Sequence, residues 1–162
     1  MINITKEFLN DIFEYRDGNL YTKKPQLRSR MKIGDKCGSF PKNHKYGSIN
    51  INRKTYLLHR IIFLYHYGYI PEYIDHINGN SFDNRIENLR PCTLIENQQN
   101  RKKSIINKTG FKGIRQRKSN LFEASIRINK KRHFYCFKTL EEANDFLIKI
   151  RKENHKSFAK NN

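Results

Sequence analysis

The feature that most constrains the fold is a compact strand–turn–strand–helix pattern in the middle of the chain. Residues 71–77 are typical of an extended segment, Asn78-Gly79 favours a turn, and residues 85–90 lead back along the first segment. A capping box at residues 93–96 then predicts a helix that runs to about Lys103. Because the helix follows the two strands directly, we expect it to pack against them.

Four polar residues of this pattern could act together on a phosphodiester. Asp75 and His76 end the first strand, and Asn97 lies in the first turn of the helix. Hard oxygen ligands suit Mg²⁺ or Mn²⁺, so we predict that Asp75 and Asn97 bind one divalent metal ion. His76 is the predicted general base, because an imidazole can accept a proton near neutral pH. Asn88 is better placed to hold the loop behind His76 by hydrogen bonds than to bind metal.

Each of these residues also has an ordinary interpretation. Asp75 and His76 before Asn-Gly are typical of polar turns, Asn88 of a loop cap and Asn97 of a solvated helical residue. Neighbouring strand residues point to opposite faces, so Asp75 and His76 need an irregular strand end or lie on either side of the scissile group. Their combination with a capping box at the right distance favours the catalytic interpretation.

The charge of the chain predicts a polyanionic partner. The 162 residues include 33 Lys and Arg against 15 Asp and Glu, which gives a net charge of +18. The excess lies in the flanks, because residues 1–55 carry +7, residues 56–100 carry −2 and residues 101–162 carry +13. So large a self-repulsion is tolerated best when phosphates neutralise it. We therefore expect two basic flanks that hold a DNA backbone around a slightly acidic centre.

The first part of the chain predicts two hairpins between two helices. We expect a short helix capped by Thr5, a hairpin that turns at Asp17-Gly18, a second hairpin over residues 46–58, and a buried helix that ends at Gly68. The segment from Lys23 to Lys45 is basic and turn-rich, which favours loop with one short strand.

The last part of the chain predicts a three-stranded meander followed by a helix. The strands are expected within residues 111–137, with Phe122, Ala124, Ile126 and Ile128 alternating towards one face of the middle strand. Thr139 is expected to cap a helix with one apolar face.

Membrane proteins and disulfide or zinc scaffolds are disfavoured. No stretch approaches the roughly 20 apolar residues that span a bilayer, and the N-terminus has no signal-peptide hydrophobic region, so we expect a cytoplasmic protein. Cys37, Cys92 and Cys136 lie far apart and form no C-x-x-C pair, which predicts ordinary reduced cysteines.

The central residues lie within short motifs: His59-Arg60, D-H-I-N-G-N at 75–80, N-R-I-E-N-L at 84–89, and Glu96, Asn97 and Asn100. Through these motifs residues 56–100 resemble the HNH nucleases, also called His-Me finger or ββα-metal nucleases, and in particular the homing endonucleases of phages and introns. The resemblance implies that Asp75 and Asn97 bind the metal, that His76 is the general base and that Asn88 positions His76. Many HNH enzymes have His in place of Asn97, and Asn occurs there in the homing subset, so the departure concerns metal preference.

We expect different roles for His59 and Arg60, the two residues of the first motif. Arg60 follows a strand and opens a helix, where a cation can reach phosphate. His59 is explained equally well by packing on the second face of that helix, and no catalytic role is assigned to it.

The C-terminal segment carries the motifs G-F-K-G-I-R-Q-R, F-E-A-S-I-R, an aromatic third strand that ends F-K-T, and L-E-E-A. Residues 107–155 thereby resemble the three-stranded DNA-binding domain of plant ethylene-response factors, which implies a sheet laid in the major groove. The expected base readers are Arg115, Arg117 and Arg127, and the expected phosphate contacts are Lys112, Lys130 and Arg132. The tryptophans of the plant domains are absent, and Phe122 stands where one is expected, so no sequence preference is implied. The alternative is a solvated basic strand face.

The basic N-terminal loop is a weaker candidate for DNA contact. Arg28 and Arg30, with Lys23, Lys24 and Lys32, suit a minor-groove or backbone arm, and a packing scaffold with a basic loop explains them equally well. Arg101, in the linker after the central helix, completes the set of predicted DNA-binding residues.

Together these patterns predict an α+β fold: a small N-terminal antiparallel sheet, a central ββα-metal nuclease motif, and a C-terminal three-stranded antiparallel sheet packed on one helix. We expect three segments, residues 1–55, 56–103 and 104–162. The predicted function is a metal-dependent, homing-type HNH endonuclease for double-stranded DNA, a monomer or weak homodimer in the cytoplasm of the host of a phage or mobile element. The alternative is a non-catalytic, sequence-specific DNA-binding regulator with a degenerate HNH core.

Overall fold

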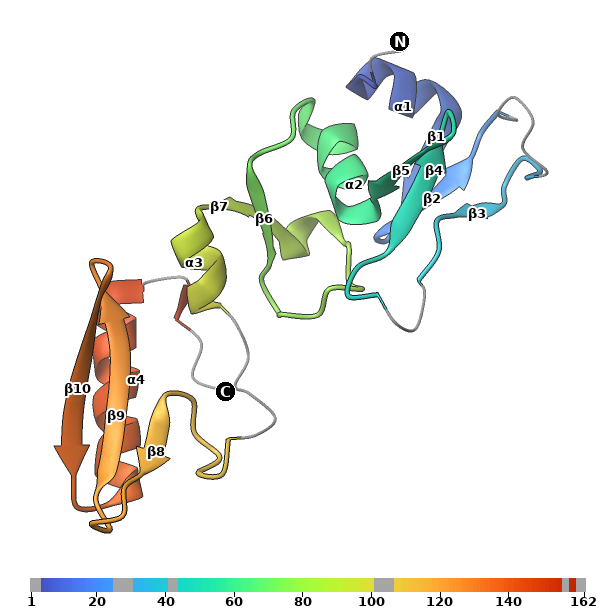
Figure 1. The fold of residues 1–162 in the computed structure, drawn as a ribbon. Coiled ribbons are helices and arrows are strands. Elements are labelled where there is room, and N and C mark those ends of the chain that lie inside the picture. Colours follow the sequence, from blue (N-terminus) through green and yellow to red (C-terminus); the bar gives the residue numbers. More distant parts are fainter. Residues whose placement is uncertain (1–3, 25–30, 41–43, 101–106, 156–157, 160–162) are drawn as a thin grey trace. The chain divides into compact units, whose positions relative to one another are not determined.

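The computed structural model describes residues 4–24, 31–40, 44–100, 107–155 and 158–159 (Figure 1). It has the predicted α+β class, with several small antiparallel sheets. The chain divides into two compact units, residues 1–93 and 94–162. Among the described residues, none of the helices has both the length and the hydrophobicity to cross a lipid bilayer.

The first unit begins with a helix and a three-stranded sheet. Its elements are α1 (Lys6–Ile12), β1 (Phe13–Arg16), β2 (Asn19–Thr22) and β3 (Lys36–Cys37), with the strands in that order. The side chain of Thr5 accepts a hydrogen bond from the backbone N–H of Phe8, as its predicted capping role requires. The hairpin turns at Asp17 and Gly18, whose φ angles of 43° and 79° match the predicted tight turn.

A second hairpin leads into the central helix. Strands β4 (Ser48–Ile51) and β5 (Lys54–Leu57) pair antiparallel, and α2 (Leu58–Tyr67) follows at once. The helix ends at Gly68, which takes the left-handed conformation and donates its N–H to the carbonyl of Leu64. Both predicted elements are confirmed.

The strand pair at the centre of the sequence motif is regular. Strand β6 (Tyr73–His76) pairs antiparallel with β7 (Leu89–Cys92), which places Asp75 opposite Arg90 and His76 opposite Leu89. The return strand begins later than the sequence suggested, because residues 86–88 first form a short 3₁₀ turn, η1 (Ile86–Asn88). Neither an irregular strand end nor a bulge separates Asp75 from His76, so their side chains leave opposite faces of β6.

The helices and sheets of the first unit pack around one hydrophobic core. Its fully buried side chains come from the N-terminal sheet, the second hairpin and α2, and include Leu9, Phe13, Leu20, Ile51, Leu58, Ile61, Ile62 and Phe63. Ile74 of β6 and Leu89 of β7 belong to the same cluster. The N-terminal sheets thus share a core with the strand pair that carries Asp75 and His76, and the three-segment division remains a prediction.

The second unit contains a short helix, a meander and a long helix. Its elements are α3 (Leu94–Gln99), β8 (Ile114–Gln116), β9 (Phe122–Ile128), β10 (Lys131–Phe137) and α4 (Leu140–His155), with β9 in the middle of the sheet (Figure 1). Helix α3 ends at Gln99 rather than near Lys103. The predicted linker falls mostly on residues 101–106, outside the described residues.

The meander packs on α4 as the alternating pattern predicted. Ala124 and Ile126 of β9 are buried with Ala143 and Leu147 of α4 in one apolar cluster. At the start of α4, the backbone N–H of Glu142 donates to the hydroxyl of Thr139, and the backbone N–H of Thr139 donates to the Glu142 carboxylate. This reciprocal capping box fixes where the helix begins.

Candidate active site and nucleic-acid interface

Asp75 is a buried carboxylate held by an arginine. It is 5% exposed, and both Nε and Nη2 of Arg90 approach its Oδ2, at 2.9 and 2.7 Å. The pairing follows from the register of β6 and β7, which places the two residues directly opposite each other. A buried carboxylate requires such compensation, and the pair fixes the direction in which Asp75 points.

His76 lies on the other face of β6 and is held by an amide. Its ring is 5% exposed, and its Nε2 lies 3.1 Å from Oδ1 of Asn84. Since a carbonyl oxygen only accepts, Nε2 carries the proton, and the basic lone pair is on Nδ1. Burial lowers the pKa of His76, against the opposing effect of the Asn84 hydrogen bond. The ring is therefore neutral at neutral pH.

An aromatic group surrounds the His76 ring. The ring of Tyr46 stacks on it with the centroids 6.1 Å apart, and the ring of His59 meets it edge to face at 5.2 Å. His59 and Tyr46 also contact each other, with centroids 5.0 Å apart. His59 is thus packed in the core beside His76, which favours the packing interpretation of this residue.

Asn88 ties the loop after His76 to the strand pair. Its side-chain oxygen accepts the N–H of Asn78, and its amide nitrogen donates to Oδ1 of Asn78 and to the carbonyl of Asp83. The carbonyl of Asn88 also accepts the N–H of Ile77. These bonds are of the kind expected for a residue that holds the loop.

The same loop is closed by an ion pair with two hydrogen bonds. Arg85 donates through Nε and Nη2 to the two carboxylate oxygens of Asp83, at 2.9 and 2.8 Å. The hydrogen bonds from Arg85 lower the pKa of Asp83 to about 2. Asn84, between these two residues, is thereby presented to His76.

The predicted metal ligands lie in different units. Asp75 is in β6, whereas Asn97 is a half-buried residue of α3, which belongs to the second unit. No cluster of three or more His, Cys, Asp or Glu side chains that could hold a metal occurs within the described ranges. A carboxylate and an amide oxygen instead fit a hard cation such as Mg²⁺, which keeps most of its ligands as water and phosphate.

Arg60 of α2 is engaged with the protein backbone. Its two Nη atoms donate to the carbonyls of Pro71 and Glu72, at 3.1 and 3.2 Å. The arginine thus anchors the segment that leads into β6. Its contact with DNA stays a prediction.

The face of the meander opposite α4 carries arginines arranged by one buried acid. Glu123 of β9 is 2% exposed, and its Oε1 accepts from Nε of Arg115 at 2.6 Å while its Oε2 accepts from Nε of Arg117 at 2.8 Å. The Arg115 hydrogen bond is the main cause that lowers the pKa of Glu123. The two guanidinium groups, largely exposed, are thus held on one surface.

The remaining basic residues of this surface lie along β9 and β10. Arg127 and Arg132 face each other across the strand pair, and Lys130 occupies the turn between the strands at φ 65°. Lys112 donates from Nζ to the carbonyl of Gln99 at 2.7 Å. The predicted DNA contacts Arg28, Arg30 and Arg101 lie outside the described residues.

Sequence reasoning assigned no role to several residues of these sites. Asn84 is the first residue of the N-R-I-E-N-L motif at 84–89, and this position was the only indication of its role in the sequence. Arg90, Tyr46 and Glu123 gave no comparable signal, because their partners are set by strand register and by packing between distant segments.

Similarity to known proteins identifies the family of the chain. Residues 56–99 match the model of a family described as HNH endonuclease, so the chain carries an HNH endonuclease domain. The chain is also similar to protein 3.8 of Escherichia phage T7, with 32% identity over 96 residues that cover 57% of this chain and 79% of that protein. It belongs to the same family as this phage protein. No solved structure matches the chain.

Proposed function

We propose that the protein is a metal-dependent endonuclease that hydrolyses phosphodiester bonds in double-stranded DNA. The observation that carries the proposal is His76, which follows Asp75 in β6, is buried within the matched HNH domain and is held through Nε2 by Asn84. A neutral imidazole with a fixed tautomer is suited to take a proton from water, which is the first requirement of hydrolysis.

In the proposed mechanism each residue has one task. Nδ1 of His76 accepts the proton of the attacking water, while the hydrogen bond to Asn84 keeps the ring in place. Asn88 is a positioning residue that holds the adjoining loop. Asp75 and Asn97 would hold one divalent ion, Mg²⁺ or Mn²⁺, which when bound supplies charge neutralisation on the phosphoryl and leaving oxygens.

The DNA is held mainly by the second unit in this proposal. Arg115, Arg117 and Arg127 would read base edges, where the fork of a guanidinium suits guanine. Arg60, Lys112, Lys130 and Arg132, with the predicted arm and linker residues Arg28, Arg30 and Arg101, would contact phosphates. The net charge of +18 supports a polyanionic substrate.

The biological setting is also a proposal. The T7 relative supports a phage protein that acts in the cytoplasm of the host cell. We propose a homing-type enzyme that acts as a monomer or weak homodimer, with one catalytic centre per chain, so that cleavage of both strands requires a pair of chains or two successive nicks.

The Asp75–Arg90 pair favours a second candidate function. Nε and Nη2 of Arg90 both approach Oδ2 of Asp75, and a carboxylate used in this way also suits a purely structural role. The protein would then be a sequence-specific DNA-binding regulator with a degenerate HNH core. Cleavage separates the two candidates, since both bind DNA.

The test is cleavage of supercoiled plasmid and phage genomic DNA by the full chain with Mg²⁺ or Mn²⁺, and with EDTA. The proposal expects nicked or linear product that disappears in EDTA and in Asp75→Asn. The matched control is Asp11→Asn. Asp11 is an exposed residue of α1, and within the described part of the chain its ion pair is with the exposed Lys24. DNA binding without cleavage under any of these metal conditions would support the regulator instead.

A further inference from the structure

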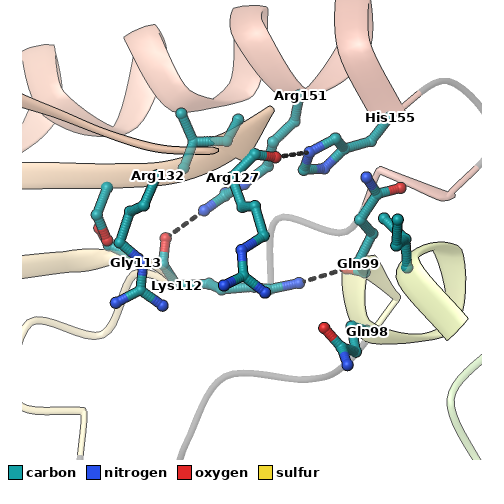
Figure 2. A pocket seen from close by; sticks show the side chains of 11 residues that line it. Gln98, Gln99, Lys112, Gly113, Arg127, Arg132, Arg151 and His155 are labelled. Carbon is teal, nitrogen blue, oxygen red and sulfur yellow. Dashed lines mark hydrogen bonds between the residues drawn. The ribbon is translucent and has the colours of Figure 1, made fainter. Parts of the chain in front are cut away.

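The second unit contains a cationic cavity that is also lined by Arg151 and His155, to which the proposed function gives no role. Figure 2 shows this cavity, which has a volume of about 310 Å³. Its lining includes Lys112, Arg127, Arg132, Arg151 and His155, and none of the eleven described residues that line it is acidic. Gln98 and Gln99 of α3 form part of the wall.

Two of its arginines are placed against each other. Arg127 and Arg132 are direct partners in the register of β9 and β10, so their side chains leave the same face of the sheet. Like charges at directly opposite positions of an antiparallel pair are destabilising. An anion between the two guanidinium groups would turn this repulsion into attraction.

A third arginine enters the cavity from α4. Arg151 is 3% exposed, and its Nη2 donates to the carbonyl of Lys112. Gly113 permits this approach, because a Cβ there would lie 2.9 Å from Nη2 of Arg151 and 2.8 Å from the carbonyl oxygen of Ser125. A guanidinium has five N–H donors in a planar fork that matches phosphate oxygens.

Lys112 and His155 are also fixed by contacts to the backbone. Nζ of Lys112 donates to the carbonyl of Gln99, and Nε2 of His155 lies 3.2 Å from the carbonyl of Arg127 (Figure 2). The His155 bond has a carbonyl acceptor, so Nε2 carries a proton. The side chains of Lys112, Arg151 and His155 are therefore held by backbone carbonyls before any ligand binds.

The cavity continues onto the face of the sheet proposed to read DNA. A neighbouring hollow of about 350 Å³ shares Gly113, Ser125 and Arg132 with it, and is otherwise lined by Ile114, Arg115, Glu123 and Phe134. Arg127 and Arg132 are exposed at the boundary. A duplex bound on this face would therefore have backbone phosphates beside the cavity.

We propose that this cavity binds one phosphate of the DNA backbone, clamped by Arg127, Arg132 and Arg151, so that Arg127 contacts this phosphate instead of a base edge. The inference rests on the proposed function, since it names how the second unit holds the substrate. Gln98 and Gln99 belong to the helix that carries Asn97, so a filled cavity connects the DNA backbone with that helix.

The test is the salt dependence of binding of the full chain to a 30-base-pair duplex in EDTA. Arg132→Gln and Arg151→Gln should each lower the salt slope by about 1, the loss of one phosphate contact, and lower affinity by about 5–10-fold. The double variant should lose little more than either single variant, because both contact the same phosphate. The matched control, Lys149→Gln, removes an exposed charge of α4 that does not line the cavity and should keep the slope.

Three results would overturn the clamp. One is a wild-type slope in Arg132→Gln, which changes an exposed residue. Another is fully additive slope losses in the double variant. The third result would show that the cavity binds free phosphate instead of DNA. It is tested by comparing the melting temperature of the protein in inorganic phosphate and in chloride at matched ionic strength. A higher melting temperature in phosphate that Arg151→Gln abolishes, with unchanged DNA affinity, would assign the cavity to free phosphate. Because EDTA prevents cleavage, these outcomes are independent of whether the enzyme cuts DNA.

Discussion

Acid is predicted to destabilise the first unit through His59. This ring is 5% exposed, it packs against the rings of His76 and Tyr46, and its Nδ1 has no hydrogen-bond partner in the part of the chain that the structure describes. Burial, and then the nearby His76 and Arg60, lower the pKa of His59 to about 3. The folded protein therefore keeps this ring neutral at pH values where the unfolded chain protonates it.

The magnitude follows from the two pKa values. The contribution of a neutral His59 to stability is fully present above the unfolded pKa of about 6.5 and is lost as the pH falls towards about 3. Between pH 7 and pH 5 the unfolded chain gains most of one proton and the folded chain gains almost none. The free energy of unfolding should therefore fall by about 2 kcal/mol from this residue alone.

The assay is urea unfolding followed by tyrosine fluorescence at pH 7 and pH 5. Eight of the nine tyrosines lie in residues 1–93, so the signal reports on the first unit. The wild type should lose about 2 kcal/mol more than His59→Phe over this pH range, whereas an exposed-site control, His133→Phe, should behave as the wild type. Equal pH losses in the wild type and His59→Phe would refute the reasoning.

Three further substitutions test other contacts. Gly18→Ala should lower the free energy of unfolding in the same assay by about 1–3 kcal/mol, because φ is +79° and a Cβ would lie 2.8 Å from the backbone nitrogen of Arg85. Asn84→Ala should slow single-turnover cleavage by about 10–100-fold with unchanged DNA affinity, since His76 loses the acceptor of its Nε2 proton. Glu123→Gln should reduce discrimination between the target duplex and random DNA by about 1–3 kcal/mol, measured by competition binding, because two arginines lose their charged partner.

The order of elements could be predicted because it depends on local rules. Asp17-Gly18 supplied the turn, Gly68 the end of a helix, and alternation in residues 122–128 the buried face of a strand. The return strand was placed too early, because the η1 turn that delays it to Leu89 has no periodic signal.

The candidate site was only partly visible in the sequence. His76 and Asp75 stand in a recognisable motif, whereas the arginine that holds Asp75 and the tyrosine that stacks on His76 are determined by strand register and by packing across the core. In the same way, Arg115 was visible as a basic strand residue, but the buried acid that orients it was not. Local sequence patterns therefore predict the helices and strands, whereas the contact partners of the site residues depend on the tertiary structure.

The most direct measurement is the single-turnover rate of DNA cleavage by His76→Ala with Mg²⁺ and saturating protein. His133→Ala is the matched control, since this exposed histidine of β10 has no assigned role. Loss of the general base should slow cleavage by about 10²–10⁴-fold while DNA affinity stays the same. A His76→Ala rate equal to that of the wild type would contradict the assignment of His76 as the base.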